Sequence, residues 1–282
     1  RSLDDLEFLL NRAVDLSLRQ KLEDRLIFGV FEKMLSTADL DDDSEMEQIL
    51  DAALRIQKGE MDEPLHALDM IAESGVSFME QRYCSGSLTT LRDWFLGWKP
   101  DIMMLEKMKS MGIDLDTPLV KGRTPAFLVA SKEYHKKSAF DKKDPEEELA
   151  KAMACFSRES MEALDDKGIS AAHEAAKNNH ARMMEVMIRA GINVNLTEDA
   201  PQVAGTTLLH TACRYGNPEV VKLLIEAGAD DTMLNAKEES PAHVALFHNY
   251  ITGSKRLEPE DRIELIRELK HVDVPGRYGM TP

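Results

Sequence analysis

The stretch Gly205–Asn217 reads GTTLLHTACRYGN, and it decides how the rest of the chain is interpreted. It places His210 three residues before Cys213, so both side chains lie on one face if the stretch is helical. Such a pair could ligate a metal or supply half of a nucleophilic couple. The alternative is that both residues only support the fold. A structural pattern should recur along the chain, whereas a catalytic one need not.

The pattern does recur. A hydroxyl residue, a histidine and a later glycine occur as two matching sets, namely Thr207, His210 and Gly228, and Ser170, His173 and Gly191. In both sets the hydroxyl residue precedes the glycine by 21 residues. A third copy opens with SPAH, in which Ser240 lies 33 residues after Thr207. Partial copies begin at GRTPAF (122–127) and at the terminal Thr281 and Pro282, where we expect one more unit to be cut off.

Each unit predicts a helix, a turn and a second helix. The hydroxyl residue caps the first helix, and Pro125 and Pro241 occupy the first helical position, where no N–H is needed. The turn follows at residues 216–218. The predicted second helices are apolar at Val220, Val221, Leu223, Leu224 and Ile225, and at Met183, Met184, Val186, Met187 and Ile188. Gly228 and Gly191 stand where a helix ends in a left-handed residue.

These units resemble the ankyrin repeat, which is about 33 residues long and opens T-P-L-H-x-A. The resemblance is strongest over Asp165–His243 and weaker over Leu105–Phe127. It implies an all-α ankyrin-repeat solenoid of about six or seven helix pairs, with loops on one side and an extended concave surface. It also implies that His210, with its equivalents His173 and His243, ties one repeat to the next. Cys213 would then be a small buried residue, matched by Ala176 and Leu246.

The chain is expected to have two parts. Residues 1–60 are an atypical N-terminal helical region, either a cap or degenerate repeats, and residues 61–282 are the array, clearest over 101–282. Second helices are expected at 64–74, 146–156 and 262–269, and a further helix at 45–56. The sequence SRES (157–160) replaces the terminal glycine turn of one unit. Insertions are expected at the lysine-rich segment 131–147, at 198–205 and at 248–261.

Composition narrows the classes of partner. The chain has 51 acidic and 35 basic residues and a formal net charge of −16, which repels nucleic acid and anionic membranes. Three separated cysteines and no CxxC favour free thiols in a reducing compartment. No apolar run approaches the roughly 20 residues that span a bilayer. We therefore expect a monomeric cytoplasmic protein, with a secreted effector as the alternative.

Motifs for catalysis or metal binding are weak. HEAAK (173–177) lacks the second histidine of the HExxH zinc motif, because Lys177 stands in its place. The acidic segment 38–47 lacks the spacing of a calcium loop. No glycine-rich phosphate cradle and no GxSxG motif occur in the sequence. We expect no enzyme activity, no metal and no cofactor.

The predicted function is the recognition of another protein. The resemblance implies that exposed first-helix positions and loop tips make the contacts. The first-helix positions are Arg214, Tyr215, Lys177, Asn178, Phe247 and His248, and the loop tips are Asn195, Glu198, Asp199, Asp166, Lys167, Asn235 and Lys237. One alternative is the regulatory or targeting arm of a larger enzyme or secreted effector whose catalytic part lies outside this chain. Another is a self-associating structural module. Two further features stay open: the lysine-rich insertion is either a charged loop or an acidic-partner site, and Trp94 and Trp98 are either packed or an exposed patch.

Overall fold

The computed structural model describes residues 68, 71–73, 77–79, 81–84, 87–90, 92–93, 96, 102–119, 122–131, 145–199, 204–247 and 258–282. The chain divides into two compact units, Arg1–Ile113 and Asp114–Pro282. The predictions for residues 1–60, the 60/61 boundary, His248, Trp94, Trp98 and the lysines of the 132–143 insertion fall outside the described residues and stay predictions.

In the first unit, helix α6 (Ile102–Ser110) buries Met104, Leu105 and Met108 along one face. Gly112 follows with φ +74°. The N–H of Ile113 donates to the Met108 carbonyl over 3.0 Å, which closes the helix through a left-handed glycine.

The first unit also contains a hairpin that the sequence analysis did not predict. Strand β1 (Gln81–Cys84) pairs antiparallel with β2 (Ser87–Thr90), so that Gln81 lies opposite Thr90 and Cys84 opposite Ser87. Two strands of four residues give no clear alternation of apolar and polar residues, so the periodicity argument had little to detect.

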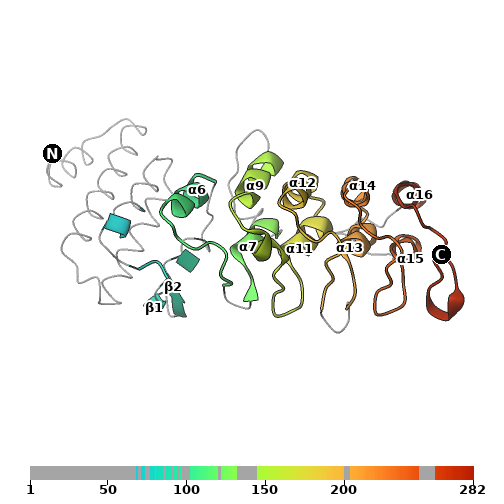
Figure 1. Ribbon diagram of the computed structural model, residues 1–282, viewed down its shortest axis with the longest axis horizontal. Helices are drawn as coiled ribbons and strands as arrows, with labels where there is room; N and C mark the ends of the chain where they lie inside the picture. The colour runs from blue at the N-terminus through green and yellow to red at the C-terminus, as the bar shows by residue number, and fades with distance from the viewer. Residues whose placement is uncertain are drawn as a thin grey trace, which may run out of the picture. The chain divides into compact units, whose positions relative to one another are not determined.

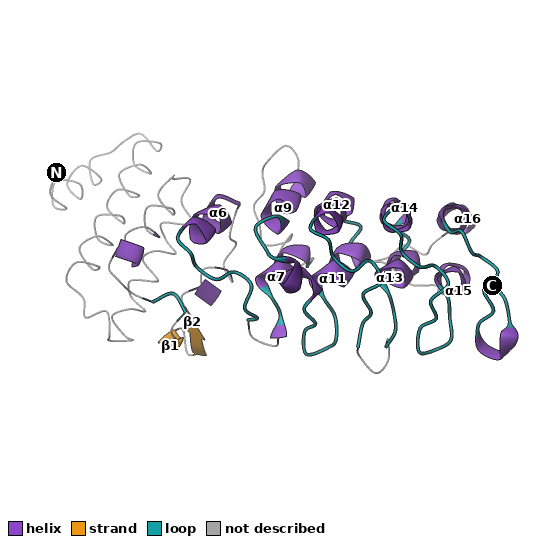
Figure 2. Cartoon of the chain, viewed as in Figure 1, coloured by secondary structure: helices purple, strands orange, loops and turns teal. Residues whose placement is uncertain are grey.

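The second unit is a stack of helix pairs. Its first helices are α7 (Pro125–Ala130), α11 (Ala171–Lys177), α13 (Leu208–Tyr215) and α15 (Pro241–Phe247). Its second helices are α9 (Pro145–Met153), α12 (Ala181–Arg189), α14 (Pro218–Glu226) and α16 (Pro259–Glu268). Each row contacts its own neighbours, and the loops project beyond the first helices (Figures 1 and 2). The expected helical solenoid is therefore confirmed over this unit.

Small residues let the first helices approach closely. Ala172, Ala176, Ala212 and Ala245 are fully buried. The second helices instead bury larger side chains, Met183, Met184, Met187, Val220, Val221 and Leu224. Small side chains in one row and large ones in the other let neighbouring repeats pack closely.

Each repeat opens with the predicted cap. The side chains of Thr124, Ser170 and Thr207 each accept an N–H from the residue three positions later, at 3.2–3.3 Å. Gly191 and Gly228 have φ of +82° and +90° and close their second helices as expected. Loss of such a cap typically costs about 1 kcal/mol.

Two predicted boundaries differ from the structure. The helix expected at 146–156 is α9, which ends at Met153, because Cys155 and Phe156 donate to carbonyls only three residues back. The SRES sequence is not a simple turn, since Ser157 caps a further short helix, α10 (Arg158–Glu162), that contacts α7 and α11. The helix expected at 262–269 is α16, whose helical conformation begins earlier, at Pro259.

The loops, which we call fingers, are bonded to one another. A left-handed residue stands two positions before each cap: Gly122, Gly168, Gly205, Glu238 and Gly279. Backbone hydrogen bonds of 2.8–3.1 Å join neighbouring fingers. The N–H of Asp199 donates to the carbonyl of Gly168, that of Ala236 to the carbonyl of Ala204, and that of Arg277 to the carbonyl of Glu238. A Cβ on Gly122 would meet the Asp166 side chain at 2.9 Å, so neighbouring fingers pack closely.

Candidate partner-binding face

His210 is held on both ring nitrogens, which answers the question raised by the opening stretch. Its Nδ1 accepts the backbone N–H of Thr207 at 3.2 Å and lies 2.8 Å from the Thr207 hydroxyl. With Nδ1 accepting, Nε2 carries the proton and donates to the Glu239 carbonyl of the next repeat at 2.9 Å. The imidazole is fully buried and joins two repeats.

The same arrangement recurs in two other repeats. Nδ1 of His173 lies 2.8 Å from the Ser170 hydroxyl, and its Nε2 lies 3.3 Å from the Thr206 carbonyl. His243 makes the corresponding contacts with Ser240 at 2.8 Å and with the Met280 carbonyl at 3.1 Å. The resemblance-based role of these histidines as ties between repeats therefore agrees with the geometry.

The electrostatics of this position oppose nucleophilic chemistry. Burial lowers the pKa of His173 and His210 to about 4, so both rings are neutral at physiological pH. Burial also raises the pKa of the fully buried Cys213 thiol, which keeps it protonated. Within the described ranges, no group of three or more His, Cys, Asp and Glu side chains is arranged to hold a metal ion.

The first helices end on one face of the second unit, and their equivalent positions carry different chemistry. Lys177 and Asn178 stand at the end of α11, Arg214 and Tyr215 at the end of α13, and Phe247 at the end of α15. Phe247 is 64% exposed, whereas Lys177, Asn178 and Tyr215 are half-buried and Arg214 is buried. We call this set the inner face.

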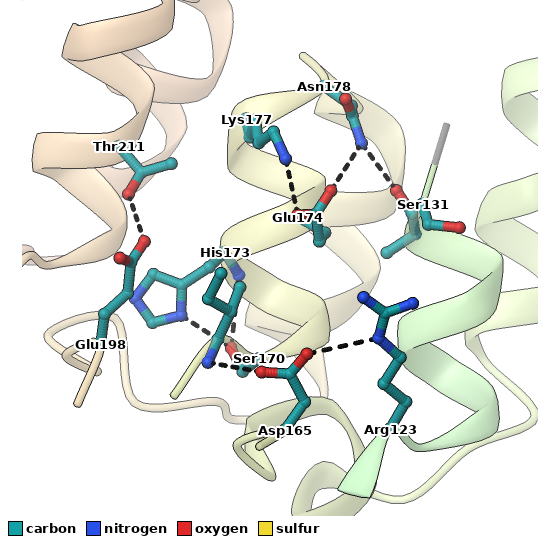
Figure 3. Close-up of polar contacts among 12 residues, drawn as sticks. Arg123, Ser131, Asp165, Ser170, His173, Glu174, Lys177, Asn178, Glu198 and Thr211 are labelled. Carbon is teal, nitrogen blue, oxygen red and sulfur yellow. Dashed lines mark hydrogen bonds and ion pairs between the residues drawn. The ribbon is translucent and has the colours of Figure 1, made fainter. Parts of the chain in front are cut away.

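On α11 the inner face is tied by a small polar network (Figure 3). The Glu174 carboxylate accepts Lys177 Nζ at 2.7 Å and Asn178 Nδ2 at 3.3 Å. Asn178 Nδ2 also donates to the Ala130 carbonyl at the end of α7, at 3.0 Å. These contacts fix the orientation of Lys177 and Asn178, so they present a preorganised surface.

At α13 a finger folds onto the inner face. Thr197 and Thr207 form an antiparallel bridge, and the Thr211 hydroxyl donates to the Glu198 carboxylate at 3.2 Å (Figure 3). Glu198 is only 8% exposed. Burial raises its pKa to about 7, against the opposing effects of Arg214, the Thr211 hydroxyl and Lys177 and with a small contribution from Glu174.

The finger tips divide into exposed and structural residues. Asp166, Lys167, Asp199 and Lys237 are exposed. Asn235 is buried, because its Oδ1 accepts the backbone N–H groups of Lys237 and Glu239 at 2.8 and 3.1 Å and closes its own turn.

Asn195 is also engaged within the array. Its Oδ1 accepts the N–H of Asp230 in the next repeat at 2.8 Å. Asn195, Asn235 and Glu198 thus have structural contacts, although whether any of the chosen residues touches a partner stays a prediction.

The sequence analysis missed Glu174, Thr211 and Asp165. Asp165 occupies the place of Asn235 two fingers earlier, where it accepts the N–H of Lys167 at 2.9 Å and contacts Arg123 at 3.3 Å (Figure 3). Counting back five residues from each cap would have found it. Glu174 and Thr211 follow the histidine directly, so an alignment of the repeats on that histidine would have found both.

Comparison with known proteins agrees with the geometry. Residues 138–235 and residues 172–257 each match the family model for ankyrin repeats, a model that comprises three copies of the repeat. Ankyrin repeat domain-containing protein 40 of Mus musculus is 27% identical over 111 residues, which is 39% of this chain and 30% of that protein. Protein phosphatase 1 regulatory subunit 27 of Homo sapiens is 28% identical over 83 residues, which is 29% of this chain and 51% of that protein.

A third relative carries an enzyme name. Tyrosine-protein kinase HTK16 of Hydra vulgaris is 28% identical over 81 residues, which cover 28% of this chain and 10% of the kinase. The matched segments thus span about half or less of the relatives' own lengths.

Proposed function

Since this chain belongs to the ankyrin repeat family, we propose that it recognises a partner protein through the inner face and the exposed finger tips. Ankyrin repeats are in general modules for protein–protein interaction. The observation that carries the proposal is a contrast between constant and variable positions. The cap recurs in all four repeats of the second unit, the histidine in three and the closing glycine in two, whereas the ends of the first helices carry Lys177, Arg214, Tyr215 and Phe247.

The inner face has the properties of a binding surface. Tyr and Arg are the residue types most often found as hot spots, and Phe247 offers an exposed apolar anchor. The helices below are fixed by hydrogen bonds between repeats, so little conformational freedom is lost on binding.

Other partner classes have less support. The charge of −16 opposes nucleic acid and anionic membranes. No helix in the described part of the chain is long and apolar enough to cross a membrane. The proposal is for a non-catalytic monomeric binder without cofactor.

The test uses selected peptide binders. Displayed peptides are selected on the full chain, and their affinity is measured for Tyr215→Ala/Phe247→Ala and for the control Arg189→Ala/Lys222→Ala, whose residues are exposed on second helices. We expect the first variant to lose at least about tenfold in affinity and the control to be unchanged. Binders that tolerate the first variant and depend on the second would contradict the proposal.

A second candidate is the regulatory or targeting arm of a larger enzyme or secreted effector. It is favoured by the names of two relatives, a phosphatase regulatory subunit and a kinase, of which the matched segments cover 51% and 10%. The complete reading frame tests it: a catalytic domain beside the array supports this candidate, and the lack of one removes it.

A further inference from the structure

Arg214 is a buried cation that has no hydrogen-bonded counter-ion among the described residues. The residue is 9% exposed, and its Nε makes no hydrogen bond within the part of the chain that the structure describes. None of the ion pairs among the described residues includes it. Buried guanidinium groups are normally paired with a carboxylate or phosphate, because desolvation of an unpaired charge is costly.

The neighbouring carboxylates, Glu174 and Glu198, make their hydrogen bonds with other groups than the Arg214 guanidinium. On α11, Glu174 is already engaged by Lys177 at 2.7 Å and by Asn178 at 3.3 Å. On the finger, Glu198 accepts a hydrogen bond from Thr211 and interacts with Arg214 only through space. The guanidinium is thus the least satisfied of the four charged groups that interact here.

The protonation state of Glu198 decides which ligand this cluster suits. With Glu198 ionised, two cations and two anions balance. With Glu198 protonated, Arg214 and Lys177 face only Glu174, and the Glu198 hydroxyl becomes a hydrogen-bond donor. Both forms are populated near neutral pH, because the pKa of Glu198 is about 7. The protonated form offers a surplus positive charge and a donor, which together match a carboxylate.

Resting on the proposed function that the inner face binds a partner protein, we propose that the partner contributes an aspartate or glutamate side chain that docks at Arg214, between α11 and α13, with Glu198 protonated. A guanidinium binds a carboxylate through two parallel hydrogen bonds, which gives direction as well as charge. The net negative charge of the chain slows the approach of an acidic segment. Beyond about 8–10 Å that field is screened, so the local pair sets the preference.

The experiment follows the Nε–H resonance of Arg214 by ¹⁵N NMR in the full chain. The probes are acetylated, amidated Gly-Glu-Glu-Glu-Gly and its Gln and Lys counterparts, at pH 6 and pH 8. We expect the Glu peptide to shift the resonance saturably, with an affinity about tenfold weaker at pH 8. The reason is that the protonated fraction of a group with a pKa of about 7 falls by about that factor. The Gln peptide should cause no shift.

Variants separate the roles of the two residues. Glu198→Gln should abolish the pH dependence while keeping the Glu peptide bound. Arg214→Lys lacks the Nε–H resonance, so its affinity is measured by titration calorimetry beside the wild type, and it should bind at least about tenfold more weakly. Arg189→Lys, on α12, is the matched control and should bind as the wild type. The inference is overturned if the Glu peptide leaves the resonance unchanged, or if the Lys peptide binds more tightly as the pH rises. Either result leaves the proposed function standing when selected binders still depend on Tyr215 and Phe247.

Discussion

The repeat at α13 and the repeat at α7 are both joined to the segment that follows them, but by different side chains. In the first, His210 donates to the Glu239 carbonyl of the next repeat at 2.9 Å. In the second, Phe127 stands at the equivalent position, buried, with the Arg123 guanidinium 4.8 Å from the centre of its ring. The bond to the following segment is made there by the Thr124 hydroxyl, which donates to the Ser160 carbonyl at 2.8 Å.

This difference agrees with a structural role for the position. A catalytic histidine could not be exchanged for phenylalanine, because phenylalanine neither accepts nor donates a proton. A residue that joins repeats can be exchanged, since packing and a hydroxyl group can replace a ring hydrogen bond. The α7 repeat is therefore an internal control for the α13 repeat.

The largest expected effect is at Phe127. Phe127→Ala removes a buried aromatic ring between α7 and its neighbours, and such changes cost about 3–5 kcal/mol. Urea unfolding monitored by circular dichroism measures the loss. A loss below about 1 kcal/mol would mean that the α7 repeat is not held by packing as the comparison requires.

Acid should weaken the histidine repeats. The folded-state pKa of His173 and His210 is about 4, below the usual 6.5, so between these values the unfolded chain binds more protons than the folded one. Stability is therefore present above pH 6.5 and is lost as the pH falls toward 4, by about 2 kcal/mol per histidine near pH 5.

The acid effect is measured as the change in the urea midpoint from pH 7 to pH 5, in the wild type and in His210→Phe. This variant has at position 210 the residue that the α7 repeat has at Phe127. The variant should lose less stability on acidification than the wild type. Equal losses would show that His210 does not stay neutral in the fold.

The caps should differ between the two repeats. Thr207→Ala removes a helix cap and the hydroxyl contact to His210 Nδ1, which still accepts the Thr207 N–H, so we expect a loss of about 1 kcal/mol. Thr124→Ala removes a cap and also the bond to Ser160, so we expect about 2 kcal/mol. Thermal unfolding of the two variants side by side measures the difference. A greater loss of stability for Thr207→Ala than for Thr124→Ala would mean that the Thr124 hydroxyl does not join the α7 repeat to the following segment.

The repeat scaffold could be predicted from the sequence because its determinants are local. A cap, a histidine three residues later and a glycine 21 residues after the cap report on hydrogen bonds within a helix pair or to the adjacent one. One such set of residues is only weak evidence for a repeat, but its recurrence along the chain identifies the repeat specifically.

The details of the inner face could not be predicted in this way. Glu198 is buried because its finger folds onto Thr211, and the burial of Arg214 depends on the side chains around it. The link from Asn217 Nδ2 to the Ala176 carbonyl at 2.6 Å likewise joins residues 41 positions apart. Exposure at these positions depends on side chains from two repeats, which a pattern within one repeat does not contain.

Urea unfolding of His210→Ala beside Tyr215→Ala tests the separation of scaffold and recognition face most directly. His210→Ala leaves the buried Thr207 N–H without its acceptor and removes one of the two donors to the Glu239 carbonyl, so the free energy of unfolding should fall by about 1–3 kcal/mol. Tyr215→Ala changes a half-buried side chain on the inner face and should cost less than about 1 kcal/mol. A stable His210→Ala protein beside a strongly destabilised Tyr215→Ala protein would contradict the account.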